Sequence, residues 1–194
     1  MPFLGELSAL LTACLWSGGA LAFAAAAAAT KRAGSFQVNI TRLILAAVYL
    51  VLLILIAGFN VNLSNTQILY LSLSGVVGLT FGDTFLFKAF HEIGARVTML
   101  IMSIAPAIAA LLAYLILGET LSTAGVLGVA ITILGVSIVV TDRGGPGPEK
   151  IVLTTSGIVF AMLAAVGQGS GLVFAKIAFE EGEVNGFVAT AVRI

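Results

Sequence analysis

Charged residues are scarce in this chain. Only 9% of its 194 residues are Asp, Glu, Lys or Arg, whereas soluble domains average about 25%. Hydrophobic residues make up 60% of the chain, and the mean hydropathy is +1.16. So few polar side chains cannot cover a globule of this size in water. The composition therefore predicts an integral membrane protein that has the lipid bilayer as its surroundings.

Other absences narrow the function. The single cysteine, Cys14, excludes an internal disulfide and a cysteine-rich metal site. Nine basic residues balance nine acidic ones without forming a basic stripe, so we expect no nucleic-acid partner. No phosphate-binding Gly-Lys-Ser/Thr loop is present, which argues against ATP-driven transport. Since His91 has no second ligand nearby and no Ser/His/Asp set lies at usable depth, we expect no enzyme, no cofactor and no metal.

Long apolar runs dominate the rest of the sequence. A helix needs about 20 mainly apolar residues to cross a bilayer. The first run lacks the basic start of a cleaved signal and exceeds its usual core of about 7–15 residues, so we interpret it as a span. The runs predict an all-α membrane protein with these spans: Leu4–Ala29, Val38–Phe59, Ile68–Phe90, Val97–Leu117, Ala124–Thr141, Gly157–Phe179, and a seventh that starts at Gly186.

The chain also contains signs of an internal repeat. Aligning Gly5 with Gly157 matches further small and apolar positions in GELSALLTACLWSGGALAFAAAA and GIVFAMLAAVGQGSGLVFAKIAF. With a one-residue gap, Arg42 aligns with Arg193. The Gly- and Pro-rich stretch between the copies is typical of a linker. We therefore expect these three parts: a five-span repeat in residues 1–141, a linker in 142–156 and the start of a second, inverted repeat in 157–194.

One stretch places charge inside an apolar run: GLTFGDTFLFKAFHEIGA contains Asp83 and Lys88. Asp83 lies about seven residues, roughly 10 Å of helix, from the end of its span. A charge near mid-bilayer costs about 2.5–3.5 kcal/mol on insertion scales, so it needs a cavity or a partner. Asp83 either lines a substrate path or titrates as a coupling proton site, or it only fixes packing through neighbours such as Thr80 and Thr84. Lys88, at the helix end, can reach the headgroups.

Three further residues are candidates for the same path. Arg42, five residues into its span, could bind an anion, pair with Asp83 or anchor the helix at the interface. Trp16 is followed by Ser-Gly-Gly and could present an aromatic wall, although small residues also allow close helix packing. Pro106 removes one backbone hydrogen bond inside its span, which favours a kink that acts as a hinge or only shapes packing.

Taken together, these motifs resemble the EamA-type domain of the drug/metabolite transporter superfamily. The matching stretches cover residues 5–141: GELSALLTACLWSGG, NITRLILAA with Arg42, SGVVGLTFGDTFLFKAF, IGARVTMLIMSIAPAIAALLAYLILGETLS and GVLGVAITILGVSIVV. The resemblance implies ten spans in two inverted halves that move metabolites, amino acids or toxic compounds. The second copy departs from the first, since Gln168 and Gly169 stand where the first copy has Trp16 and Ser17.

The resemblance implies a transporter, and we expect it to move a small polar or amphipathic solute by alternating access. The residues expected to line its path are Asp83, Arg42, Trp16 and Pro106. The alternative is a non-transporting membrane scaffold or assembly subunit whose Gly and Ala faces bind other helices. The seventh run reaches the last residue after about eight residues, where a helix end in hydrocarbon would leave carbonyls unsatisfied. Either the sequence is a fragment, which we favour, or residues 186–194 do not insert. If the chain is this short, we expect it to form a homodimer or to pair with a second half-transporter.

Charge bias predicts an orientation. Basic residues fall on one side of the expected topology. The loops on the other side hold no Lys or Arg, and their charged residues are all acidic. Because basic loops stay in the cytoplasm, we expect the linker 142–156 to be cytoplasmic and the N-terminus external, in the cell (inner) membrane. The basic set is Lys31, Arg32, Lys88, Arg96, Arg143 and Lys150, and the acidic set is Glu119, Glu180, Glu181 and Glu183.

Overall fold

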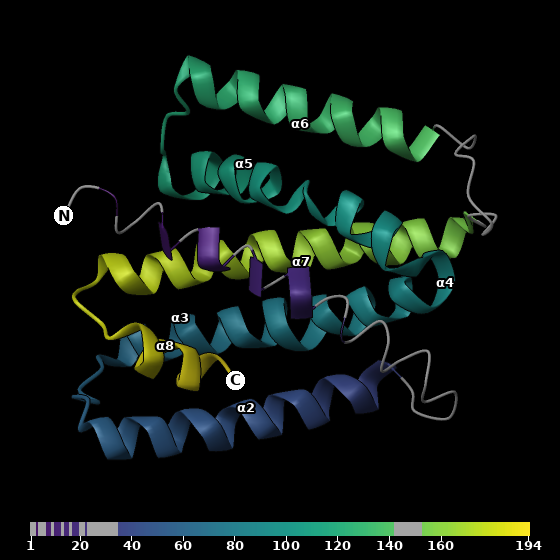
Figure 1. Ribbon diagram of the computed structural model, residues 1–194. Coiled ribbons are helices and arrows are strands. Elements are labelled where there is room, and N and C mark those ends of the chain that lie inside the picture. Colours follow the sequence, from purple (N-terminus) through teal and green to yellow (C-terminus); the bar gives the residue numbers. More distant parts are fainter. Residues whose placement is uncertain are drawn as a thin grey trace.

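The structure is a computed structural model of the chain. It describes residues 35–141 and 153–194, together with isolated positions between Phe3 and Ala22. No strand is present among these residues, and the prediction of an all-α membrane protein is confirmed. Figure 1 shows the described helices: α2 (Ser35–Ala57), α3 (Asn65–Ser74), the π-helix η1 (Gly75–Gly82), α4 (Asp83–Met102), α5 (Ala105–Leu117), α6 (Thr123–Thr141), α7 (Thr155–Glu180) and α8 (Gly186–Arg193).

Three of these helical runs are long and apolar enough to cross a membrane: Phe36–Ala57, Asn65–Met102 and Thr155–Glu180. A helix of 22 residues reaches about 33 Å, close to the roughly 30 Å of a hydrocarbon core. The outward faces of α2 and α6 carry large aliphatic side chains, as expected for surfaces that lipid covers. They include Ile44, Leu45, Leu55, Ile56, Leu127, Ile131 and Leu134.

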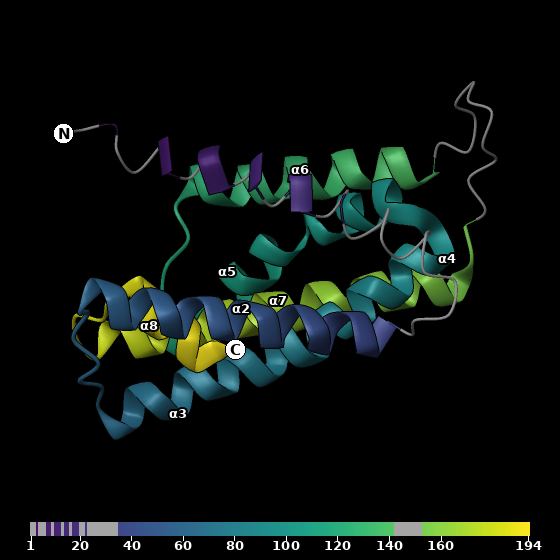
Figure 2. The ribbon, with the colours of Figure 1, turned by 60° about the horizontal axis from the view of Figure 1, so that its bottom comes forward.

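Gly94 divides the longest of these runs. At 1.5 Å per residue, the 38 residues of Asn65–Met102 would extend about 57 Å, which is too long for one span. Gly94 has φ 75° and ψ 163°, a conformation that L side chains rarely adopt. Ala89 before the break and Val97 after it belong to one buried cluster with Ala161 of α7. The two arms of α4 therefore fold over the same helix, with the bend at one end of the bundle (Figure 2).

Helix α7 lies at the centre of the described bundle. It contacts α3, η1, α4 and α5, and its buried face consists mainly of glycine and alanine. A Cβ atom added at Gly171 would lie 2.9 Å from the Cα atom of Gly78, and one at Gly167 would lie 2.8 Å from the Cα atom of Gly82. The hydroxyl of Ser74 donates to the carbonyl of Gly171 at 2.6 Å. The η1–α7 crossing is thus a backbone contact that only small residues permit.

The connections between helices gather at two opposite ends of the bundle. Residues 58–64, 118–122 and 181–185 lie at the left of Figure 1, while the bend at Gly94 and the start of α7 lie at the right. The three connections at the left contain Glu119, Glu181 and Glu183 and no Lys or Arg. This arrangement follows the alternation of span directions that the sequence predicts.

The internal repeat stays a prediction. Trp16 and most of the predicted first span, Leu4–Ala29, lie outside the described residues, so α7 has no described counterpart. The predicted boundaries at 141 and 157 fall beside the end of α6 and the start of α7, respectively. The predicted fourth span, Val97–Leu117, is interrupted by a turn at Ser103–Ile104, which separates the second arm of α4 from α5.

Candidate functional site

Asp83 is a fully buried carboxylate at the junction of η1 and α4. Its two oxygens accept hydrogen bonds from two other helices. Nη2 of Arg42 on α2 donates to Oδ2, and Nε2 of Gln168 on α7 donates to Oδ1. One carboxylate therefore joins three helices at a single point. A buried charge in hydrocarbon needs such a cation and such donors, because an isolated carboxylate there is strongly disfavoured.

The partner of Asp83 is Arg42, which is one of the roles that the sequence left open for this arginine. The guanidinium carbon of Arg42 also lies 5.7 Å from the centre of the Phe87 ring, a distance suited to a cation–π contact. Thr84, considered as an alternative partner, bonds elsewhere, since its Oγ1 donates to the carbonyl of Thr80 at 2.6 Å. Arg42 and Asp83 thus form an ion pair between α2 and α4, with an aromatic ring beside it.

Asn39 supports this ion pair from within α2. It lies one helical turn before Arg42 and is only 1% exposed. Its Oδ1 accepts a hydrogen bond of 3.0 Å from Nη2 of Arg42. Its Nδ2 donates to the carbonyl of Leu79 at 2.9 Å and to Oγ1 of Thr84 at 3.2 Å. The amide therefore orients the arginine and attaches α2 to the end of η1.

The π-helix η1 sets the position of Asp83. The backbone N–H of Asp83 donates to the carbonyl of Gly78, five residues earlier, and to that of Thr80. A π-helix rotates the residues that follow it relative to a continuous α-helix, and such segments occur frequently at functional sites. Because η1 contains Gly75, Gly78 and Gly82, its buried face has no side chains to separate it from α7. This close contact brings Asp83 within reach of Gln168.

A second arginine approaches the same site from α8. Arg193 is half-buried, and its electrostatic interaction with Asp83 is the strongest it has with any described charged group. A Cβ atom added at Gly78 would lie 3.9 Å from its Nη2 atom. The sequence alignment pairs Arg193 with Arg42, and the structure places both arginines around Asp83. The described site is thus one carboxylate that forms an ion pair with Arg42 and also interacts electrostatically with Arg193.

The other two residues predicted for the path have different outcomes. Pro106 is an exposed residue in the first turn of α5, directly after the turn at Ser103–Ile104. A proline is readily accommodated there, because the first N–H groups of a helix have no intrahelical acceptor. Helix α5 also packs against Gly169, whose added Cβ atom would lie 2.9 Å from the carbonyl oxygen of Ala105. Trp16 lies outside the described residues, so its role stays a prediction.

Charged residues elsewhere in the described bundle pair at the helix ends. Lys176 near the end of α7 forms an ion pair with Glu119 in the α5–α6 connection. Lys88 lies 4.9 Å from the ring centre of Phe85 and 5.6 Å from that of Phe160. Glu92 accepts a hydrogen bond from Thr154 at 2.8 Å at the start of α7. Within the described residues, no three His, Cys, Asp or Glu side chains come together as metal ligands.

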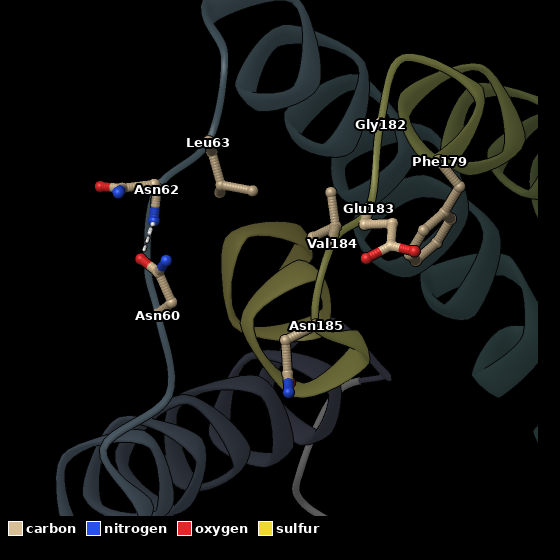
Figure 3. Close-up of a pocket in the computed structure, with 8 residues that line it drawn as sticks. All are labelled: Asn60, Asn62, Leu63, Phe179, Gly182, Glu183, Val184 and Asn185. Carbon is tan, nitrogen blue, oxygen red and sulfur yellow. Dashed lines mark hydrogen bonds between the residues drawn. The ribbon is translucent and has the colours of Figure 1, made fainter.

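A polar pocket lies at the end of the bundle where α2 joins α3 and α7 joins α8. It has a volume of about 540 Å³. Figure 3 shows residues of both connections around it, with Asn62 and Glu183 on facing sides and Phe179 at the end of α7. None of its lining residues belongs to the Asp83 site. The pocket is thus a feature of the membrane-surface loops, separate from the buried ion pair.

Sequence reasoning missed Asn39 and gave Gln168 no role in the site. Asn39 carried a usable signal, since a polar residue three positions before Arg42 shares its helix face. Gln168 was noted only as a departure between the two repeat copies. Its contact with Asp83 depends on the glycine crossing of η1 and α7, and a sequence does not show which glycine faces meet.

The fold and the site define a polytopic membrane protein with an ion pair buried among its spans. The family model described as "EamA-like transporter family" matches residues 3–141, which is more than half of the chain. The chain therefore belongs to the EamA-like transporter family and is a membrane protein of the drug/metabolite transporter type. Searches among curated proteins and among solved structures found no match.

Proposed function

We propose that this protein moves a small polar or amphipathic solute across the cell membrane by alternating access, without ATP. The observation behind this proposal is the Asp83 site, where one buried carboxylate holds side chains of α2 and α7. If the carboxylate exchanged one of these partners for a solute or a proton, it would release one helix from another. A change in binding would then become a change in packing, which is what alternating access requires.

The η1–α7 crossing supports the same mechanism. Its surfaces are backbone and glycine, so few side chains would have to change rotamer when one helix moves against the other. The hydrogen bonds at the end of the π-helix also span two different numbers of residues. The N–H of Asp83 donates both to the carbonyl of Gly78, five residues earlier, and to that of Thr80, three residues earlier. A small change in this register would rotate Asp83 relative to Gln168.

The orientation and the partners belong to this proposal. We place the end that holds the 58–64, 118–122 and 181–185 connections outside the cell, because these connections lack Lys and Arg. Exposed Arg96 lies near the bend at Gly94, at the other end, which we place in the cytoplasm. A second copy of this chain, or a second half-transporter, would supply the other wall of the solute path.

The first prediction concerns transport by the full chain in proteoliposomes. Asp83→Asn should lower the flux at least tenfold in a panel of labelled amino acids, carboxylates and organic cations. The neutral amide keeps the shape of the carboxyl group but cannot pair with Arg42. Because a buried arginine without its partner costs about 3–5 kcal/mol, the unfolding midpoint of this variant should also fall.

A double variant separates transport from folding. Asp83→Asn with Arg42→Gln removes both charges, so it should recover most of the lost stability while the flux stays low. Glu181→Gln, at an exposed position of the α7–α8 connection, is the control and should keep both. Unchanged flux in the folded Asp83→Asn variant would remove Asp83 from the mechanism. No flux of any solute by the unmodified chain would favour the membrane scaffold alternative.

A further inference from the structure

Helix α8 holds Arg193 against the centre of the bundle. Val188 and Ala189 on this helix are each 1% exposed, and the Phe187 ring stacks on Phe59 at 5.5 Å. The backbone of Arg193 packs on η1, since a Cβ atom added at Gly75 would lie 1.8 Å from the Arg193 carbonyl oxygen. The Nη2 atom of the same residue would lie 3.9 Å from a Cβ atom added at Gly78, so the Arg193 side chain runs along the glycine face of η1. Helix α8 itself lies beside α3 at one end of the bundle (Figures 1 and 2).

The guanidinium group of Arg193 has unused binding capacity. Its Nε atom is buried, and no described residue accepts a hydrogen bond from it. Asp83 is the described charged group that acts on it, but both oxygens of Asp83 already accept hydrogen bonds from Arg42 and Gln168. A buried N–H donor without an acceptor is costly. Among the described residues, Arg193 therefore lacks the acceptor that the burial of its Nε atom requires.

The charge balance of the described site points the same way. Asp83 contributes one negative charge, whereas Arg42 and Arg193 contribute one positive charge each, so one positive charge is left over. Excess charge in a low-dielectric site is strongly unfavourable unless a counter-ion joins it. A guanidinium group matches the planar geometry of carboxylates and the oxygens of phosphates. An oxyanion would supply both the hydrogen-bond acceptor and the negative charge.

We propose that Arg193, beside Asp83, binds an oxyanion group of the solute, so that the transported compounds carry a carboxylate or a phosphate. This inference rests on the proposed transport function and names its substrate class. The oxyanion accepts hydrogen bonds from the free side of the Arg193 guanidinium and balances the site's charge. Arg42 keeps its pairing with Asp83 and does not contact the oxyanion in this arrangement.

The test is a binding measurement on the full chain in detergent, which needs no transport. The probes are succinate, benzoate and inorganic phosphate at constant ionic strength, compared with the neutral amides succinamide and benzamide. At least one of the anions should raise the thermal unfolding midpoint, whereas the amides should not. Arg193→Gln should weaken the binding of that anion at least tenfold. The control Arg96→Gln removes the same charge at an exposed position and should bind as the unmodified chain does.

A second variant keeps the test possible if Arg193→Gln prevents folding. If Arg193→Gln does not fold, Arg193→Lys serves instead, because it keeps the charge but loses the guanidinium fork. It should bind the anion three- to tenfold more weakly. Equal binding of acids and amides, no effect of any of the three anions, or full anion binding by the folded Arg193 variant would each overturn the proposal. Preferential binding of phosphate over the carboxylates would assign the oxyanion to a phosphate group, and the reverse to a carboxylate.

The two proposals fail in different ways. If the proposed transport function is wrong, no flux will be seen in proteoliposomes, although Arg193-dependent anion binding in detergent persists. If the proposed substrate class is wrong, flux will depend on Asp83, but Arg193→Gln will not change the preference for acids over their amides. Binding and flux are therefore measured on the same preparations of each variant.

Discussion

Each side chain of the Asp83 site compensates a cost that another one creates. Asp83 is buried in an apolar bundle, and Arg42 supplies the opposite charge. Asn39 then orients the arginine, and Gln168 donates a hydrogen bond to the second carboxylate oxygen. A buried ion pair of this kind adds little net stability compared with packed apolar residues of similar volume. Its value at the residue scale lies in determining which helices meet and in which register.

Asn39 offers a prediction at this scale. Asn39→Ala should lower the free energy of unfolding by about 1–3 kcal/mol, because it leaves the carbonyl of Leu79 without its donor in a region that excludes water. Thermal or denaturant unfolding of the purified chain measures the change. Thr41→Ala is the control, since its hydroxyl only donates within α2, to Gln37, and its loss should cost well below that amount. Equal stability of the two variants would contradict this role of Asn39.

The sequence identified two of the charged residues of the site because charge is rare in its apolar runs. Asp83 and Arg42 stood out for that reason, and Arg193 followed from the repeat alignment. The pairing itself was one of several open roles, since spacing along separate helices does not determine which side chains meet. The role of Gln168 remained open for the same reason.

At the scale of elements, glycine determines how closely helices approach. In η1 and α7 the glycines face each other, whereas Gly128 on α6 has nothing within 4 Å of an added Cβ atom. Glycine therefore has two structural roles in this chain. Some glycines permit contact between backbones, and others only reduce the size of a surface that lipid covers.

This contrast gives a prediction for a matched pair of variants. Gly171→Ala places a methyl group 2.9 Å from the Cα atom of Gly78 and 3.1 Å from the carbonyl oxygen of Ser74, and neither backbone atom can move without shifting η1. The variant should lose about 1–3 kcal/mol of stability, as overpacked sites do. Gly128→Ala should lose none. The unfolding midpoints of both variants in one detergent test this, and a loss confined to Gly128→Ala would contradict the observed crossing.

The positions of the helices were predictable, but their interruptions were not. Apolar length alone located α2, α6 and α7, because a helix inside a membrane needs no polar face toward its surroundings. The same uniformity hides the π-helix η1 and the turn at Ser103–Ile104, since no periodic pattern changes there. Gly94 could be recognised only as part of a polar connection, and its positive φ angle inside α4 came from the structure.

At the scale of the whole molecule, the two ends of the bundle differ in charge, since the connections at one end lack Lys and Arg while exposed Arg96 lies at the other. Asn62 and Glu183 lie in separate connections around one pocket, and His91 lies three residues before Gly94, at the bend of α4. All three side chains are exposed. If the bundle crosses the membrane as proposed, the first two residues face one compartment and His91 faces the other.

Cysteine labelling tests this arrangement. In a Cys14→Ala background, Asn62→Cys and Glu183→Cys should react with a membrane-impermeant maleimide on intact cells, whereas His91→Cys should react only after permeabilisation. The background chain without cysteine controls for unspecific labelling. Opposite accessibility of positions 62 and 183 would contradict the fold. Labelling of His91→Cys alone on intact cells would instead reverse the orientation and leave the fold intact.

The link between Arg42 and Asp83 also has a consequence for biosynthesis. Arg42 leaves the ribosome about forty residues before Asp83, so α2 is synthesised before the carboxylate that balances its charge in the folded bundle. The insertion machinery would therefore retain α2 until the segment that carries Asp83 arrives, and release the two into lipid as a pair. Substitutions at Asp83 would then reduce the yield of inserted protein even where the finished bundle tolerates them.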